Sequence, residues 1–324
     1  MSGSSYAYAS GRISGLEDSL LTDRIWSQLI TAEDRDEVLR ILGDSWYGTL
    51  LQAEEGLDEA LRDAVYRAEE ELTDLTSDKS FIRGILLRRD VRNARYLWKN
   101  LASGGDGDVD VEPDGMVPVE AMKRVWGDSN IIDVLPVSFQ DTLEDIQALH
   151  SPSAALLDAI LDKLAAKVEA DNLGKLEEPV GSLPAVKIEL KNFLTAARCR
   201  SEELTPAAVE EIMLSGGYHT PSEIAEAVRV SKLAALLGEQ AGFEAAATAL
   251  ELGLESGSFL AFQKESDLMT MDILERAAGN MFSPGPLAAY VLRRELEASH
   301  LKIVAAGKAA GIDSRRLSAR VPRG

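Results

Sequence analysis

Hydrophobic positions recur at steps of three and four residues along most of the chain. In the stretch EDRDEVLRILGDSWYG, for example, Val38, Leu39, Leu42 and Trp46 follow this spacing. Such a period places apolar side chains on one face of an α-helix. Alternating apolar and polar runs are rare, and no Asn-Gly or Asp-Gly pair stands between two strand-like segments. The pattern therefore predicts an all-α protein.

Helix start signals agree with this periodicity. In HTPSEIAEAV, Thr220 is placed to cap a helix, Pro221 stands at the first helical position and Glu223 closes a capping box. The stretches LTPAAVEEI and FSPGPLAAYV have the same Ser/Thr-Pro opening without the complete box. We therefore expect a helix to begin at Pro221.

One helical pattern occurs three times, in LLRRDVRN, AVKIELKN and VLRRELEA. Each copy has a base, an acid two residues later and a fixed position three residues after the acid. The bases are Arg88, Lys187 and Arg293, the acids are Asp90, Glu189 and Glu295, and the third positions are Asn93, Asn192 and Ala298. The acids are 99 and 106 residues apart. This spacing predicts equivalent internal hydrogen-bonding positions, one in each helical repeat, although Ala298 departs from the pattern.

The repeats divide the chain into three helical units of about a hundred residues. We expect the units at 1–105, 118–204 and 205–324, with an acidic linker at 106–117. Apolar neighbours place each acid on or beside a packed face, where an unpaired charge costs several kcal/mol. The partner of each acid is then a neighbouring base or another repeat's helix. Three such units can form a superhelix or close into a ring with pseudo-threefold symmetry.

The acidic linker has some features of a metal-binding loop. Asp110, Glu112 and Asp114 resemble the start of a calcium-binding loop, but Ala121 occupies the position that needs a bidentate acid. No paired metal-ligand spacing, phosphate-binding glycine loop or nucleophile motif occurs elsewhere. The sequence therefore predicts no cofactor, no metal and no catalytic residue.

Charge and cysteine content restrict the partners. A net charge of −20 opposes direct binding to nucleic acid or to anionic lipid. A single cysteine and the absence of a long apolar run fit a cytoplasmic protein without a membrane span. The last residues, SRRLSARVPRG, form a basic tail with Arg315, Arg316, Arg320 and Arg323. We interpret this tail as a frayed terminus, with contact to an acidic partner as the alternative.

The chain resembles the C subunit of the bacterial and archaeal V-type (A-type) ATPases, a relative of the d subunit of the eukaryotic vacuolar enzyme. The N-terminal part carries Tyr8, Arg12 and the pair Leu20-Leu21, and the segment 46–48 carries Trp-Tyr-Gly. The stretches LLRRDVRNARYLWK and AAYVLRRELEASHLKIVAAGKAAGI are similar to the repeated elements of that family. The resemblance covers essentially the whole chain.

This resemblance implies a funnel of three similar helical domains that has no active site of its own. Such a funnel links the central stalk of the rotary motor to the membrane ring of proteolipid subunits, and it transmits torque for proton or sodium transport. The chain then acts in the cytoplasm and is held at the membrane through the complex. Its acidic character favours an acidic socket that attracts basic surfaces.

Two other interpretations compete with a rotor adaptor. The first is a generic helical-repeat scaffold that binds a different protein through an open groove. The second is an all-helical enzyme, which needs carboxylates that converge in one cleft with shifted pKa values.

Overall fold

A computed structural model describes residues 3–54, 56–149, 153–200 and 205–322 of the chain. All nine repeat positions named above lie in these ranges, whereas Arg323 of the basic tail lies outside them. The described residues form α-helices and short 3-10 turns and contain no strand. The prediction of an all-α protein is therefore confirmed. No helix among these residues is long and apolar enough to cross a membrane.

The first of three buried cores joins the two ends of the chain. It contains Leu29 and Leu42 from the N-terminal part together with Leu301, Leu317 and Val321 from the C-terminal part. Its helices are α2 (Asp23–Thr31), α3 (Arg35–Gly43), α4 (Gly48–Ala53), the first part of α5 (Leu57–Leu75), the end of α16 (Gly285–Ala309) and α17 (Ser314–Arg320).

The second core lies between consecutive helices in the first half of the chain. Trp98 and Phe139 meet in it edge to face, with ring centroids 6.1 Å apart. Its elements are α6 (Lys79–Ala102), α7 (Val119–Gly127), η1 (Ser129–Val134), α8 (Val137–Gln147) and α9 (Ala154–Asn172). Asp78 caps α6 by accepting hydrogen bonds from the amides of Ser80 and Phe81 at 3.0 and 3.1 Å.

The third core is the largest and holds most of the second half of the chain. Phe193, Phe262 and Leu287 are fully buried in it. Its elements are α1 (Gly3–Glu17), the end of α5, the start of α6, η2 (Leu173–Lys175), η3 (Val180–Ser182), α10 (Leu183–Cys199), α11 (Pro206–Ile212), α12 (Pro221–Arg229), α13 (Leu233–Glu239), α14 (Glu244–Ser256), α15 (Leu260–Ala278) and the start of α16. Thr220 and Glu223 form the complete capping box at α12, as predicted.

The cores group residues differently from the units expected at 1–105, 118–204 and 205–324. Residues of the first expected unit are shared among all three cores, and helix α16 is shared between two of them. The N-terminal helices complete a core that the C-terminal helices begin. Because the two ends meet in one core, the arrangement closes on itself instead of extending as a row.

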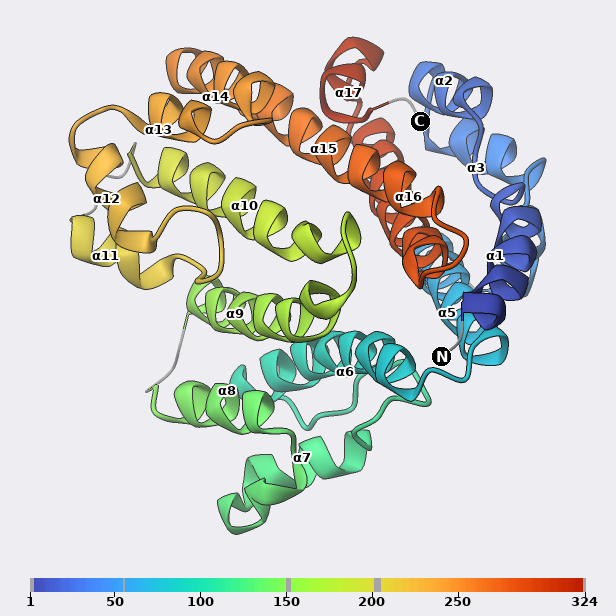
Figure 1. Ribbon diagram of the computed structural model, residues 1–324, viewed down its shortest axis with the longest axis horizontal. Coiled ribbons are helices and arrows are strands. Elements are labelled where there is room, and N and C mark those ends of the chain that lie inside the picture. The colour runs from blue at the N-terminus through green and yellow to red at the C-terminus, as the bar shows by residue number, and fades with distance from the viewer. Residues whose placement is uncertain (1–2, 55, 150–152, 201–204, 323–324) are drawn as a thin grey trace.

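Six helices form a ring around the middle of the molecule (Figure 1). In order around the ring they are α5, α6, α9, α10, α15 and α16, and each packs on the next. The ring is completed where α16 packs on α5. Helices α2, α3, α7, α8 and α11 to α14 lie outside it (Figure 1). The ring brings charged residues of distant sequence segments to a common centre.

The acidic segment between α6 and α7 is not a free linker. Asp110 pairs with Arg62 of α5, and Asp114 accepts a hydrogen bond from the Tyr66 hydroxyl at 3.0 Å. The acids that resemble a calcium loop are thus held by other side chains. Among the residues that the structure describes, no cluster of three or more His, Cys, Asp and Glu side chains could hold a metal ion.

The C-terminal tail is folded as helix α17, so the interpretation of a frayed terminus is wrong for residues 314–322. Leu317 and Val321 are buried against the first core. Lys264 of α15 donates a hydrogen bond to the carbonyl oxygen of Ser318 at 2.9 Å. Apolar burial therefore outweighs the repulsion among the tail's arginines.

Candidate functional site

Helix α6 uses its repeated residues to hold the segment that follows it. Oδ2 of Asp90 accepts hydrogen bonds from the amides of Met116 and Val117 at 3.0 and 3.1 Å. Asn93 makes a two-way contact with the backbone of Glu112, whose amide donates to Oδ1 and whose carbonyl accepts from Nδ2, both at 2.8 Å. Both side chains are fully buried. Burial raises the pKa of Asp90 to about 7, although the two amides and the nearby arginines oppose this rise.

Helix α10 makes the same contacts with its own following segment. Oε2 of Glu189 accepts from the amides of Tyr218 and His219 at 2.9 and 3.2 Å. Asn192 exchanges two hydrogen bonds of 2.8 Å with the backbone of Leu214. The second oxygen of Glu189 contacts Nδ1 of His219. In both helices the acid and the asparagine therefore attach a returning segment to the ring.

A glycine precedes the two donated amides in both returning segments. A Cβ at Gly115 would overlap Oδ1 of Asp90, and a Cβ at Gly217 would lie 2.5 Å from Oε2 of Glu189. The glycines stand 25 and 28 residues after the two acids. A glycine at a similar distance after each acid is thus a sequence signal for this contact. The spacing between the acids alone does not predict the contact.

Helix α16 departs from this arrangement. Glu295 was expected to be equivalent to Asp90 and Glu189, but it forms an ion pair with Arg88. The segment that α16 holds is the N-terminal one, and the acid that holds it is Glu297. Its Oε2 accepts from the amide of Leu21 at 2.7 Å, and its Oε1 accepts from the Tyr47 hydroxyl at 2.8 Å. Buried Arg294 donates to Oε1 of Glu297 at 2.6 Å. Arg294 and Glu297 have the three-residue spacing of Asp90 and Asn93.

The expected bases pair with acids from other elements. Two of the three pairs face the centre of the ring. The pairs are Arg88 with Glu295 at 2.6 Å, Lys187 with Glu169 at 2.7 Å and Arg293 with Glu17 at 2.9 Å. Glu295, which is partly buried, thus pairs with a base on α6, a helix distant in sequence.

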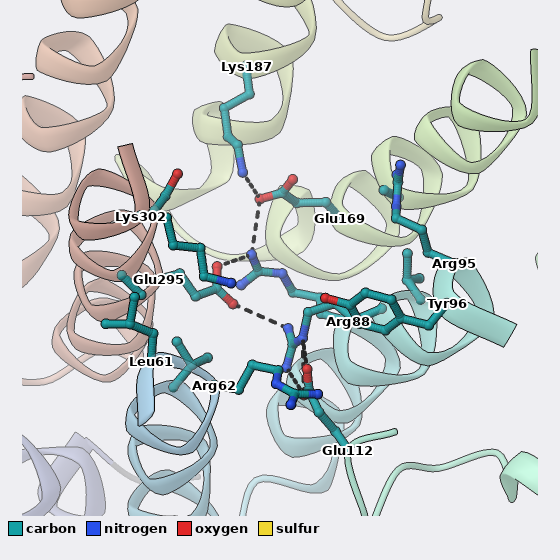
Figure 2. A pocket seen from close by; sticks show the side chains of 16 residues that line it. Leu61, Arg62, Arg88, Arg95, Tyr96, Glu112, Glu169, Lys187, Glu295 and Lys302 are labelled. Atoms are coloured by element: carbon teal, nitrogen blue, oxygen red, sulfur yellow. Dashed lines mark hydrogen bonds and ion pairs between the residues drawn. The ribbon is translucent and has the colours of Figure 1, made fainter. Parts of the chain in front are cut away.

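The centre of the ring encloses a cavity of about 470 Å³ that is open to solvent (Figure 2). Its walls come from α5, α6, α9, α10, α16 and the segment before α7. A second cavity of about 560 Å³ lies between α9, α10, α15 and α16. The two share Ala165, Glu169, Lys187, Glu295 and Ser299, so together they form one central hollow.

Charged side chains form a connected network in this central hollow. Figure 2 shows Lys187, Glu169, Arg88 and Glu295 linked in series across the ring. Burial alone would raise the pKa of Glu169, but Lys187 and Arg88 lower it below its ordinary value. The network therefore holds Glu169 ionised, and its ion pairs join α6, α9, α10 and α16.

The folded C-terminal helix also reaches the central hollow. Arg320 of α17 lines the second cavity and pairs with Asp267 of α15. Nε2 of His300 on α16 lies 2.8 Å from the same Asp267 carboxylate. This contact ties the end of the chain to the ring.

Comparison with known proteins agrees with the geometry. The family described as ATP synthase (C/AC39) subunit matches residues 9–320. The chain is also 21% identical to the C subunit of the A-type ATP synthase of Methanocaldococcus jannaschii, over 94% of this chain and 82% of that protein. The matched residues include all six helices of the ring. The chain belongs to the ATP synthase (C/AC39) subunit family.

Proposed function

We propose that this chain is a non-catalytic rotor subunit that connects the central stalk of a V-type or A-type ATP synthase to the membrane proteolipid ring. In this proposal three similar helical units form a funnel whose narrow socket receives the end of the stalk. The subunit lies at the cytoplasmic side of the membrane and is held there through the complex. It transmits torque and makes or breaks no covalent bond.

The observation that carries the proposal is the closed six-helix ring around an open hollow. A part that transmits torque has to resist shear between its helices. Here the contacts that resist it link helices distant in sequence, such as Arg88 of α6 with Glu295 of α16. An open scaffold, the alternative, would present a groove on one side of a row. The shared core of the chain ends favours the ring instead.

Family membership supports the same assignment. The relative from Methanocaldococcus jannaschii is by its name a subunit of an A-type ATP synthase. Asp90, a carboxyl group whose pKa is raised by burial, is fully buried and bonded to backbone amides. These contacts give Asp90 a structural role and favour a scaffold over an enzyme.

A reconstitution experiment tests the proposal. Membranes that carry the complex are stripped of this chain, and ATP hydrolysis and ion transport are then measured before and after purified chain is returned. We expect hydrolysis by the catalytic sector to persist without the chain and ATP-driven ion transport to return only with it. Ion transport that continues in fully depleted membranes would contradict the proposal.

A further inference from the structure

The charged side chains that line the first cavity carry a net charge opposite in sign to the charge of the whole chain. The sequence has 34 basic and 54 acidic residues, whereas the first cavity is lined by six bases and three acids. The bases are Arg62, Arg88, Arg92, Arg95, Lys187 and Lys302, and the acids are Glu112, Glu169 and Glu295. The acidic socket expected from the overall charge is therefore contradicted at the lining of the cavity.

The two lysines that line the first cavity are also more exposed than any of its three acids. Lys187 and Lys302 keep 39% and 44% of their side chains exposed, whereas Glu112 and Glu169 keep only 10% and 14%. In the second cavity, Lys191 is 45% exposed and pairs with a less exposed Asp162. The ammonium groups therefore offer more accessible surface to a molecule that enters the hollow than the less exposed carboxylates do.

The second cavity adds an apolar wall beside these ammonium groups. Pro184, Leu292 and Leu296 line it on α10 and α16. A surface that is cationic on one side and apolar on the other is complementary to an amphipathic helix whose polar face carries acids. The acidic exterior of the chain repels such a segment elsewhere, so the hollow is the favoured place for it.

We propose that the central hollow receives an acidic, amphipathic helix end of the central-stalk partner, with its carboxylates on Lys187, Lys191 and Lys302. This inference rests on the proposed function and specifies the chemistry of the partner that the socket accepts. Lys187 and Lys191 lie on α10 and Lys302 lies on α16, so one inserted end contacts both sides of the ring.

A charge-neutralisation experiment tests this inference with the full-length chain. The purified central-stalk subcomplex of the same organism is titrated against wild type, against the cavity variant K187Q/K191Q/K302Q and against the control variant K79Q/K175Q/K232Q. The control replaces three exposed lysines outside the hollow and changes the net charge by the same amount. Circular dichroism and urea unfolding verify that each variant is folded. Dissociation constants are measured at about 50 and about 300 mM NaCl. Salt screens electrostatic attraction only weakly at the lower concentration and strongly at the higher one.

The expected result is a dissociation constant about tenfold or more higher for the cavity variant than for the control, with a weaker salt dependence than wild type shows. Equal binding by the two variants would overturn the inference, because general charge would then decide affinity. Tighter binding by the cavity variant would also overturn it and would indicate a basic inserted end. Binding of wild type to the subcomplex is measured first, before any variant is compared. Failure of wild type to bind would contradict the proposed function itself.

Discussion

Arg88 of α6 and Glu295 of α16 form an ion pair across the central hollow, with 2.6 Å between Nη2 and Oε2. The two residues are 207 positions apart in sequence. Both side chains are mostly buried, at 13% and 22% exposed. A pair in this position is screened less than one on the surface, so it contributes to the relative placement of α6 and α16.

A double-mutant cycle measures this contribution. We expect Arg88→Met and Glu295→Gln, compared singly and together in urea unfolding, to show a coupling energy of about 1–3 kcal/mol. The matched control is the exposed pair of Arg229 and Glu226 on α12. Its coupling should be indistinguishable from zero at ordinary ionic strength. Equal coupling in the two cycles would show that the central pair has no special role.

The asparagines of α6 and α10 should be important for stability. Asn93→Ala and Asn192→Ala each remove two hydrogen bonds of a buried side chain and leave a backbone amide and carbonyl without these partners. We expect each to lower the free energy of unfolding by roughly 2–4 kcal/mol. The control Asn130→Ala changes an exposed side chain and should have little effect. Denaturant unfolding with unchanged m values is the measurement, and a loss no larger than the control's would refute the assignment.

The glycines next to the repeat acids should not tolerate a methyl group. Asp90 and Glu189 are each fixed by two amides, so they cannot move aside for a Cβ at Gly115 or Gly217 without losing those bonds. We expect Gly115→Ala and Gly217→Ala to cost about 1–3 kcal/mol each. Gly15→Ala, in α1 with open space around the new methyl group, should be neutral or slightly stabilising. Thermal unfolding of the three variants compares them directly, and equal melting temperatures would argue against the described packing.

Asp90 should make stability depend on pH in a defined direction. Its pKa rises from 3.8 to about 7 on folding, so between these values the folded state binds more protons than the unfolded state. The contribution of this group is therefore present at low pH and is lost as pH rises towards 7, at about 1.4 kcal/mol for each pKa unit. Asp90→Asn removes this dependence.

The measurement is urea unfolding of wild type and Asp90→Asn at pH 5 and pH 8. The difference between the two proteins, and not either curve alone, isolates Asp90 from the other carboxylates. We expect the free energy of unfolding of wild type, relative to that of the variant, to be larger at pH 5 than at pH 8. A difference that stays constant over this range would mean that the carboxyl group has an ordinary pKa.

The sequence predicts the helical class and the capping box at Thr220 correctly, because helical period and capping are local properties of the chain. It also singles out Asp90, Asn93, Glu189 and Asn192, which share the same backbone contacts. In these two helices the held segment follows closely, so the spacing pattern and the contact coincide.

In the third copy of the pattern, on α16, the sequence does not predict which acid holds a backbone segment. Glu297, and not Glu295, holds a segment that lies 276 residues earlier in the chain. No local sequence pattern predicts a contact between residues at that separation. Glu295 matches the spacing of the repeat, but its contact is an ion pair with another helix of the ring.

The sequence also does not predict the charge of the side chains that line the central hollow. The net charge of −20 is a sum over the whole surface. It does not say which bases the ring directs inwards. Arg62, Arg95 and Lys302 come from three different helices and are brought together only by the closed fold.

Simultaneous capture of both proposed partners tests the central claim most directly. The purified chain is immobilised and incubated with the central-stalk subcomplex, with the detergent-solubilised proteolipid ring, and with both together. We predict that each binds alone and that the two are retained together on one chain, because a bridging protein has separate surfaces for them. Competition between the two, or binding of neither by a folded chain, would contradict the account.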